Sequence, residues 1–82
     1  TDTGDTVHEK MYARETELLT MMAVRKMPEQ RRKCFCMSRI ENMSNAEIAE
    51  KLELSVRTVE RHIYLALNDI RDIMELYSPD KD

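Results

Sequence analysis

Residues 45–63 read NAEIAEKLELSVRTVERHI, and this stretch decides the fold. Its apolar residues recur every three or four positions on both sides of residues 53–55, as in two helices joined by a three-residue turn. Ala49 is small where two steeply crossing helices must touch, and Ser55 is a preferred cap for the second helix. The stretch therefore predicts a helix-turn-helix.

One turn residue, Glu53, fits that geometry poorly. The position usually has a positive φ and favours Gly, because a side chain there clashes with the backbone. We expect Glu53 to cost about 1 kcal/mol in this conformation.

The rest of the chain extends the helical pattern outward. Met27–Pro28 separates the first two expected helices, because the residue before Pro avoids the α region and Pro suits a first helical turn. Thr6–Glu9 (TVHE) and Ser44–Glu47 (SNAE) fit capping boxes, and Pro79 ends the last helix. No segment alternates with period two, so we predict an all-α, four-helix fold without a wing or sheet. The expected helices of this domain, residues 6–77, cover residues 6–26, 29–41, 45–52 and 55–76, and the expected tails cover residues 1–5 and 78–82.

Helical spacing also predicts which apolar residues face the core. They are Met11, Leu18, Leu19 and Met22 in the first helix, Cys34, Phe35, Met37 and Ile40 in the second, Ala46, Ile48, Ala49 and Leu52 in the third, and Val56, Val59, Ile63, Ala66, Leu67, Ile70, Ile73 and Met74 in the fourth.

Composition excludes several classes of protein. A chain of 82 residues with one Gly cannot supply a Gly-rich phosphate loop and leaves little room for an enzyme pocket. No nucleophile–base pair or ligand cluster is visible, so we expect no enzymatic activity, no metal and no cofactor. No apolar run approaches the roughly 18 residues of a membrane span, and no signal peptide is visible, so we expect a cytoplasmic protein without membrane insertion. Cys34 and Cys36 point in different directions on a helix, so we expect two reduced thiols.

Charge is unevenly placed along the chain. The formal net charge is −3, to which residues 1–9 contribute −3 and residues 75–82 contribute −2, which leaves +2 on residues 10–74. A negative chain is not a basic nucleic-acid binder, so any DNA binding by the isolated chain should be weak and strongly salt-dependent.

The outer face of the fourth expected helix favours DNA binding. It carries Arg57, Thr58, Glu60, Arg61 and Tyr64 near the end that a recognition helix places in the major groove. Arg bonds guanine, Glu accepts from cytosine N4, and Tyr packs on a thymine methyl. The alternative is a solvated charged face, in which Glu60 pairs with Arg57 or Tyr64 is half buried.

Several segments carry a resemblance to a known family. Met27–Arg32 (MPEQRR), Ser38–Leu52 (SRIENMSNAEIAEKL) and Leu54–Ile63 (LSVRTVERHI) resemble region 4 of an extracytoplasmic-function sigma factor, and the likeness covers about residues 15–74. The LuxR-type output domain of response regulators shares the core of this pattern. The leading Pro-x-x-x-Arg helix and the Ala-x-x-x-x-Arg tail, Ala66 to Arg71, favour the sigma family.

The resemblance implies promoter recognition. Such a domain binds the minus-35 element with its last helix and docks on the β flap of RNA polymerase through a concave apolar surface. In many members an anti-sigma factor covers one or both faces. The implied partners are therefore double-stranded promoter DNA, the polymerase core and an anti-sigma factor. A full sigma factor also needs a second domain that nothing here resembles, so we expect this chain to be a C-terminal part.

The resemblance also assigns roles to residues. The implied base-facing residues are Glu60, Arg61 and Tyr64, and the implied phosphate-facing residues are Ser44, Ser55, Arg57 and Thr58. Asn42 and Glu53 stand where the family usually has Gly, and Glu60 stands where it often has a basic residue. For Glu60, a contact with cytosine and mere repulsion from phosphate both stay open.

A third alternative is a helical module that binds protein and not DNA. Met suits adaptable binding surfaces, and four methionines could serve such a surface. They are Met21, Met22, Met37 and Met43. The competing explanation is that they simply fill the core.

Overall fold

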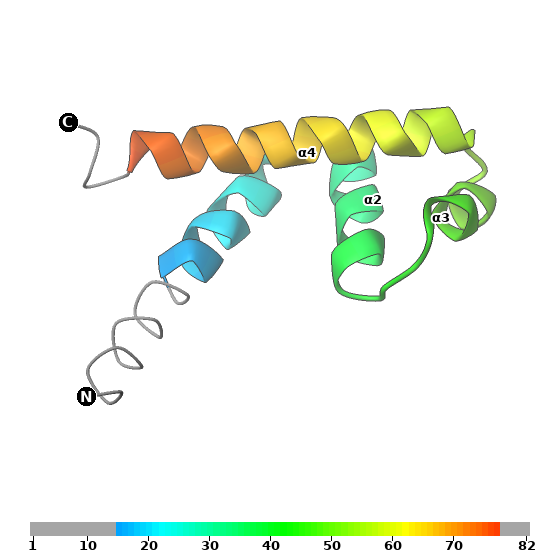
Figure 1. Ribbon diagram of the computed structural model, residues 1–82, viewed down its shortest axis with the longest axis horizontal. Coiled ribbons are helices and arrows are strands. Elements are labelled where there is room, and N and C mark those ends of the chain that lie inside the picture. The colour runs from blue at the N-terminus through cyan, green and yellow to red at the C-terminus, as the bar shows by residue number, and fades with distance from the viewer. Residues whose placement is uncertain (1–14, 78–82) are drawn as a thin grey trace, which may run out of the picture.

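The computed structural model describes residues 15–77, which fold into helices joined by short turns (Figure 1). Within that range there is no strand, so the predicted all-α fold is confirmed. The helices are one over residues 15–26, α2 (Glu29–Arg39), α3 (Asn45–Leu52) and α4 (Val56–Leu76). The two predicted tails, the capping box at Thr6–Glu9, the core position Met11 and the helix end at Pro79 lie outside the described residues.

The long helix α4 is the element on which the others are assembled. Helix 15–26 and α2 lie against the same side of α4, and α3 lies beside its N-terminal end (Figure 1). α2 packs on both α4 and α3, and α3 packs on α4. Because α4 contains no Gly or Pro and its apolar residues recur at helical spacing, it forms one uninterrupted helix.

Two clusters of buried apolar side chains form the core. The first consists of Ala23, Met27, Phe35, Ala66 and Ile70, and the second consists of Cys34, Ile48, Ala49 and Val59. The first cluster holds helix 15–26 and α2 against the middle of α4. The second holds α2 and α3 against the start of α4, which fixes the helix-turn-helix.

Some residues that were predicted to face the core are exposed. Leu18 and Met22 are exposed because the segment packs through Ala23, which lies on a different face of helix 15–26, and through Met27, just past the end of that helix. Ile40 is 74% exposed because it lies past the end of α2, which stops at Arg39 and not at residue 41.

Three further positions of the predicted core also face solvent in part or fully. Ala46 and Val56 are exposed because α3 and α4 pack through other faces of their first turns, which carry the buried Ile48 and Val59. Leu67 is exposed because it lines an apolar groove between three helices.

The end of α2 is set by its backbone hydrogen bonds. The N–H groups of Ile40 and Glu41 both donate to the carbonyl oxygen of Cys36, at 2.8 and 3.3 Å. Asn42 then adopts a φ of 56°, a left-handed conformation that Asn tolerates better than most residues.

The turn between α3 and α4 has the backbone that the sequence predicts. Glu53 has φ 58° and ψ 47°, which confirms the positive φ expected at this position. The N–H of Leu54 donates to the carbonyl oxygen of Ala49 at 2.8 Å, so the turn satisfies a carbonyl group at the end of α3. Glu53 therefore keeps a side chain where the backbone favours Gly.

The predicted capping box at the start of α3 is confirmed. The Oγ of Ser44 accepts the N–H of Glu47 at 3.1 Å, and a carboxylate oxygen of Glu47 accepts the N–H of Ser44 at 2.8 Å. Two amide groups at the helix start are thus satisfied reciprocally, which contributes about 1 kcal/mol to stability.

Replacing Glu53 by Gly should raise the free energy of unfolding by about 0.5–1 kcal/mol, because the left-handed penalty on a side chain exceeds the entropy that Gly adds to the unfolded chain. Asn42→Gly is the matched control, and it should change stability by less than about 0.5 kcal/mol because Asn tolerates this conformation. Urea unfolding followed by circular dichroism measures both variants. A gain for Glu53→Gly no larger than that for Asn42→Gly would contradict this explanation.

Candidate functional site

The first turns of α4 carry an exposed polar face. Arg57, Glu60, Arg61 and Tyr64 are all exposed, and Tyr64 retains 64% of its accessible surface. Spacings of three and four residues place them on one side of α4, away from the buried Val59. The structure thus brings together the predicted base-facing residues and one predicted phosphate-facing residue.

These four side chains have no polar partner among residues 15–77. The ion pairs in that part of the chain join Arg31 to Asp69 and Lys33 to Glu29, and its side-chain hydrogen bonds involve other residues. The alternative in which Glu60 pairs with Arg57, or in which Tyr64 is half buried, is therefore not supported.

The start of α4 presents free backbone amides. Ser55 caps the helix, as predicted: its Oγ accepts the N–H of Thr58 at 3.0 Å, and its hydroxyl donates to the Oγ1 of Thr58 at 2.8 Å. The first intrahelical bond runs from the N–H of Val59 to the carbonyl oxygen of Ser55 at 3.1 Å. The N–H groups of Val56 and Arg57 precede that bond and have no intrahelical acceptor. Together with the helix dipole they favour an anion at this end of α4.

The other predicted phosphate-facing serine, Ser44, lies at the start of α3. Its side chain is exposed, and its hydroxyl is engaged in the capping box. Contact of any of these residues with DNA stays a prediction.

An apolar groove of about 730 Å³ opens between helix 15–26, α2 and α4. Its apolar walls are formed by Met21, Val24, Phe35, Cys36, Ile40, Leu67 and Ile70. Glu17, Thr20, Arg25 and Arg39 complete its lining. Met21 is 56% and Ile40 is 74% exposed, and apolar surface that is open to solvent in this way marks interaction sites.

Sequence reasoning did not identify the members of this groove. It placed Ile40 and Leu67 in the core, although both are exposed. The surplus of methionines was the available signal, and it was partly correct, because Met21 lines the groove. Met37 and Met43 are instead partly buried against the second cluster.

The two cysteines occupy different environments. Both thiols are free, and Cys34 is buried while Cys36 is half-buried in the wall of the groove. Burial raises the pKa of the Cys34 thiol, because desolvation disfavours the thiolate. Cys36 is therefore the thiol that a reagent in the groove can reach.

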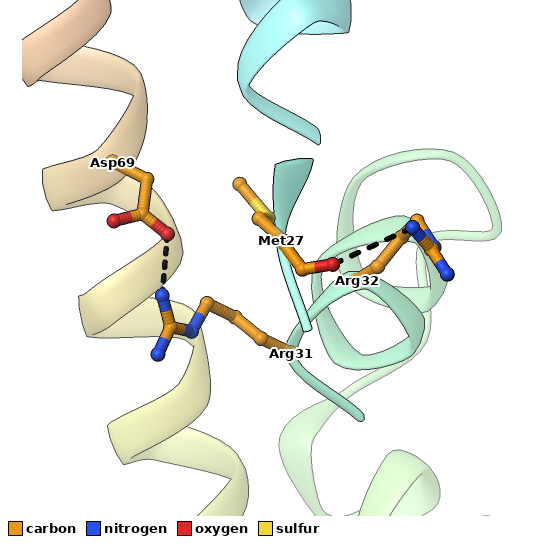
Figure 2. A network of polar contacts seen from close by, with 4 residues as sticks. All are labelled: Met27, Arg31, Arg32 and Asp69. Carbon is orange, nitrogen blue, oxygen red and sulfur yellow. Dashed lines mark hydrogen bonds and ion pairs between the residues drawn. The ribbon is translucent and has the colours of Figure 1, made fainter. Parts of the chain in front are cut away.

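Polar contacts from α2 tie together the helices that frame the groove. Arg31 forms an ion pair with Asp69 of α4, with 2.5 Å between Nη1 and Oδ2 (Figure 2). The adjacent Arg32 points the other way, and its Nη1 lies 3.5 Å from the carbonyl oxygens of Met27 and Arg25 at the end of helix 15–26. Neighbouring residues of α2 thus contact the two helices on either side of it.

Residues 15–77 contain neither a cluster of metal-ligating side chains nor a helix suited to a membrane. No group of three or more His, Cys, Asp or Glu side chains is placed to hold a metal ion. None of the helices in this part of the chain combines the length and the hydropathy that crossing a bilayer requires.

Comparison with protein families gives one match. The model of the family described as Sigma-70, region 4 matches residues 17–70. The matched range is more than half of the chain, and it holds the helix-turn-helix, the exposed face of α4 and every residue that lines the groove. No curated protein and no solved structure matches the chain.

The Arg31–Asp69 pair should couple α2 to α4 by about 1 kcal/mol, because an arginine–carboxylate pair that is partly shielded from water is stronger than a fully exposed one. A double-mutant cycle with Arg31→Met and Asp69→Leu, followed by urea unfolding, measures this coupling energy. The matched control is the exposed pair Lys33–Glu29, whose coupling should not exceed about 0.5 kcal/mol. Equal coupling energies in the two cycles would mean that Arg31 does not help to fix the helix arrangement.

Proposed function

The chain belongs to the sigma-70 region 4 family, and we propose that it recognises a minus-35 element for an extracytoplasmic-function sigma factor while docking on the β flap of RNA polymerase. Region 4 is a DNA-binding helix-turn-helix domain with which a sigma factor recognises the minus-35 promoter element in transcription initiation. Membership in this family sets the LuxR-type alternative aside. The observation that carries the proposal is the exposed face of α4 around Arg61, whose polar side chains have no partner within residues 15–77.

We infer that α4 enters the major groove with its first turns. Arg61 lies in the second turn of α4, and its guanidinium is free to bond the O6 and N7 of guanine. Tyr64 supplies an exposed ring for contact with a thymine methyl. Ser55, Thr58 and Arg57 lie at the helix start, where hydroxyls, free amides and a guanidinium suit the phosphates beside the groove.

Ser44 would add a contact between the start of α3 and the phosphates of the DNA backbone. It begins the first helix of the helix-turn-helix, which crosses the DNA backbone in this class of domain. Two capped helix starts contacting phosphates would fix the register of α4 without carrying sequence information.

The apolar groove supports the second half of the proposal. Its open volume of about 730 Å³ and its apolar walls suit an amphipathic helix laid between helix 15–26 and α2. The proposed occupant of the groove is the tip of the β flap. Polymerase must bind this domain while α4 is on promoter DNA, and a partner in the groove leaves the DNA-facing end of α4 free. Arg25 and Arg39 in the lining favour acidic residues beside the apolar stripe of that helix.

Tethering to polymerase also accounts for the charge of the chain. A net charge of −3 disfavours tight binding to DNA by the isolated chain. Docking on polymerase raises the local concentration of α4 at the promoter, so modest intrinsic affinity is sufficient. An anti-sigma factor would inhibit by covering either the groove or the face around Arg61.

Promoter DNA and RNA polymerase are both cytoplasmic, so a cytoplasmic location is part of the proposal.

Arg61→Ala should weaken binding to a preferred duplex by about tenfold, because a bidentate contact with guanine is lost. Arg71→Ala is the matched control: it removes the same charge about 15 Å further along α4, so it should weaken binding by about threefold or less. Fluorescence anisotropy at low salt measures both, with a duplex that the wild-type chain enriches from a randomised library. Equal losses for the two variants would contradict a base-facing role for Arg61.

Ile40→Glu should weaken binding to a purified β-flap fragment by about tenfold or more, because a carboxylate would be desolvated against the apolar stripe of the flap helix. Leu76→Glu is the matched control, since Leu76 is 71% exposed but lies outside the groove, and its binding should be unchanged. Anisotropy of labelled flap gives the affinities, and protection of Cys36 from iodoacetamide by bound flap reports occupancy of the groove.

Each of the three outcomes of the flap experiment is informative. Saturable binding that Ile40→Glu weakens and Leu76→Glu does not would support docking in the groove. Absence of flap binding, with DNA binding retained, would contradict the polymerase half of the proposal. Absence of both would favour the helical protein-interaction module.

A further inference from the structure

We propose that the DNA-facing end of α4 reads the two strands of its site with two different rows of side chains, and that Glu60 in one row selects cytosine. The proposal rests on DNA recognition by α4 and adds the class of base that each row contacts. The pyrimidine row consists of Val56, Glu60 and Tyr64, and the purine row consists of Arg57 and Arg61.

The two rows follow from the helical register of exposed residues. Members of each row are four residues apart, so they lie one above another along α4. The rows run side by side, because Arg57 follows Val56 and Arg61 follows Glu60 in the sequence. All five side chains are exposed, including Val56, which keeps 42% of its surface in solvent although it is apolar.

The members of the pyrimidine row share a chemistry. The methyl groups of Val56 and the ring of Tyr64 are suited to the C5-methyl group of thymine, and the carboxylate of Glu60 is suited to the N4 amino group of cytosine. Both features are carried by pyrimidines in the major groove. The guanidinium group of Arg61 instead fits the O6 and N7 acceptors of guanine, a purine, while that of Arg57 contacts the phosphate beside it, as proposed above. The face therefore matches a pyrimidine-rich strand beside its purine-rich complement.

Glu60 is the residue that makes this arrangement selective. A carboxylate among phosphates is repelled, and no ion pair within residues 15–77 neutralises it. A cytosine N4 donor offsets this repulsion, whereas the O4 acceptor of thymine adds to it. Glu60 thus discriminates mainly by penalising the wrong base, and an unpaired charge is an effective way of doing so.

The experiment uses the 82-residue chain and a library of duplexes with a randomised centre. The fraction bound at low salt is sequenced, and the affinity for the most enriched duplex is measured by fluorescence anisotropy. We expect enrichment of a pyrimidine-rich strand with cytosine at one fixed position. Replacing that C·G pair by T·A should lower the affinity of the wild-type chain by about tenfold.

Three variants identify the residue responsible. Glu60→Ala should reduce the C·G to T·A discrimination to about twofold, and Glu60→Gln should shift the preference at that position toward adenine, since Gln pairs with adenine N6 and N7. Glu75→Gln is the matched control, because it removes the same charge about 22 Å further along α4 and should leave the preference unchanged.

The outcomes separate this proposal from the function on which it rests. If Glu60→Ala raises the affinity for the C·G and T·A duplexes equally, Glu60 is only repulsive and the selection of cytosine is wrong. Enrichment of sites without a fixed cytosine also overturns it, while DNA recognition by α4 stands. If the wild-type chain enriches no sequence, the proposed function itself is contradicted.

Discussion

Two consecutive residues of α2 hold the structure together. Cys34 is buried in the cluster that fixes the helix-turn-helix, and Phe35 is buried in the cluster that fixes helix 15–26 to α4. Adjacent positions on a helix point about 100° apart, so a single turn of α2 reaches two separate packing sites. Neither cluster is large, and a chain of this size buries only about 60% of its unfolded surface. The relative placement of the exposed polar face of α4 and the groove therefore depends on α2.

Helix α4 contributes to two surfaces of opposite chemistry. The first turns of α4 present charged and aromatic side chains without partners among the described residues, while Leu67 and Ile70 of its middle line an apolar groove. The two surfaces do not compete, because the first faces away from α2 and the second faces helix 15–26 and α2. Family membership explains why one small domain carries both: a region 4 domain must meet promoter DNA and RNA polymerase.

Local chemistry made much of the fold predictable from the sequence. The capping box at Ser44, the cap at Ser55 and the left-handed turn at Glu53 each depend on a few neighbouring residues, and the structure contains all three. The groove was not predictable in the same way. Periodicity marks Ile40 and Leu67 as apolar members of a helical face, but not as residues left uncovered when three helices meet. That outcome depends on contacts between distant segments, such as Arg31 with Asp69. For the candidate site, the exposed face of α4 followed from its register, whereas the roles of its residues came from the resemblance.

Because α4 is one unbroken helix, a small tilt at the groove displaces its N-terminal end. Leu67 in the groove and Arg57 in the exposed first turn of α4 are ten residues apart, which is about 15 Å along a rigid helix. A tilt of about 5° about the groove would displace Arg57 by about 1 Å, a large fraction of the tolerance of a hydrogen bond. In the proposed mode of DNA binding, an occupant that sits slightly differently in the groove would therefore change the fit of the α4 side chains to the bases without itself touching the DNA. Mechanical stiffness, which the absence of Gly and Pro gives to α4, thus links the two surfaces.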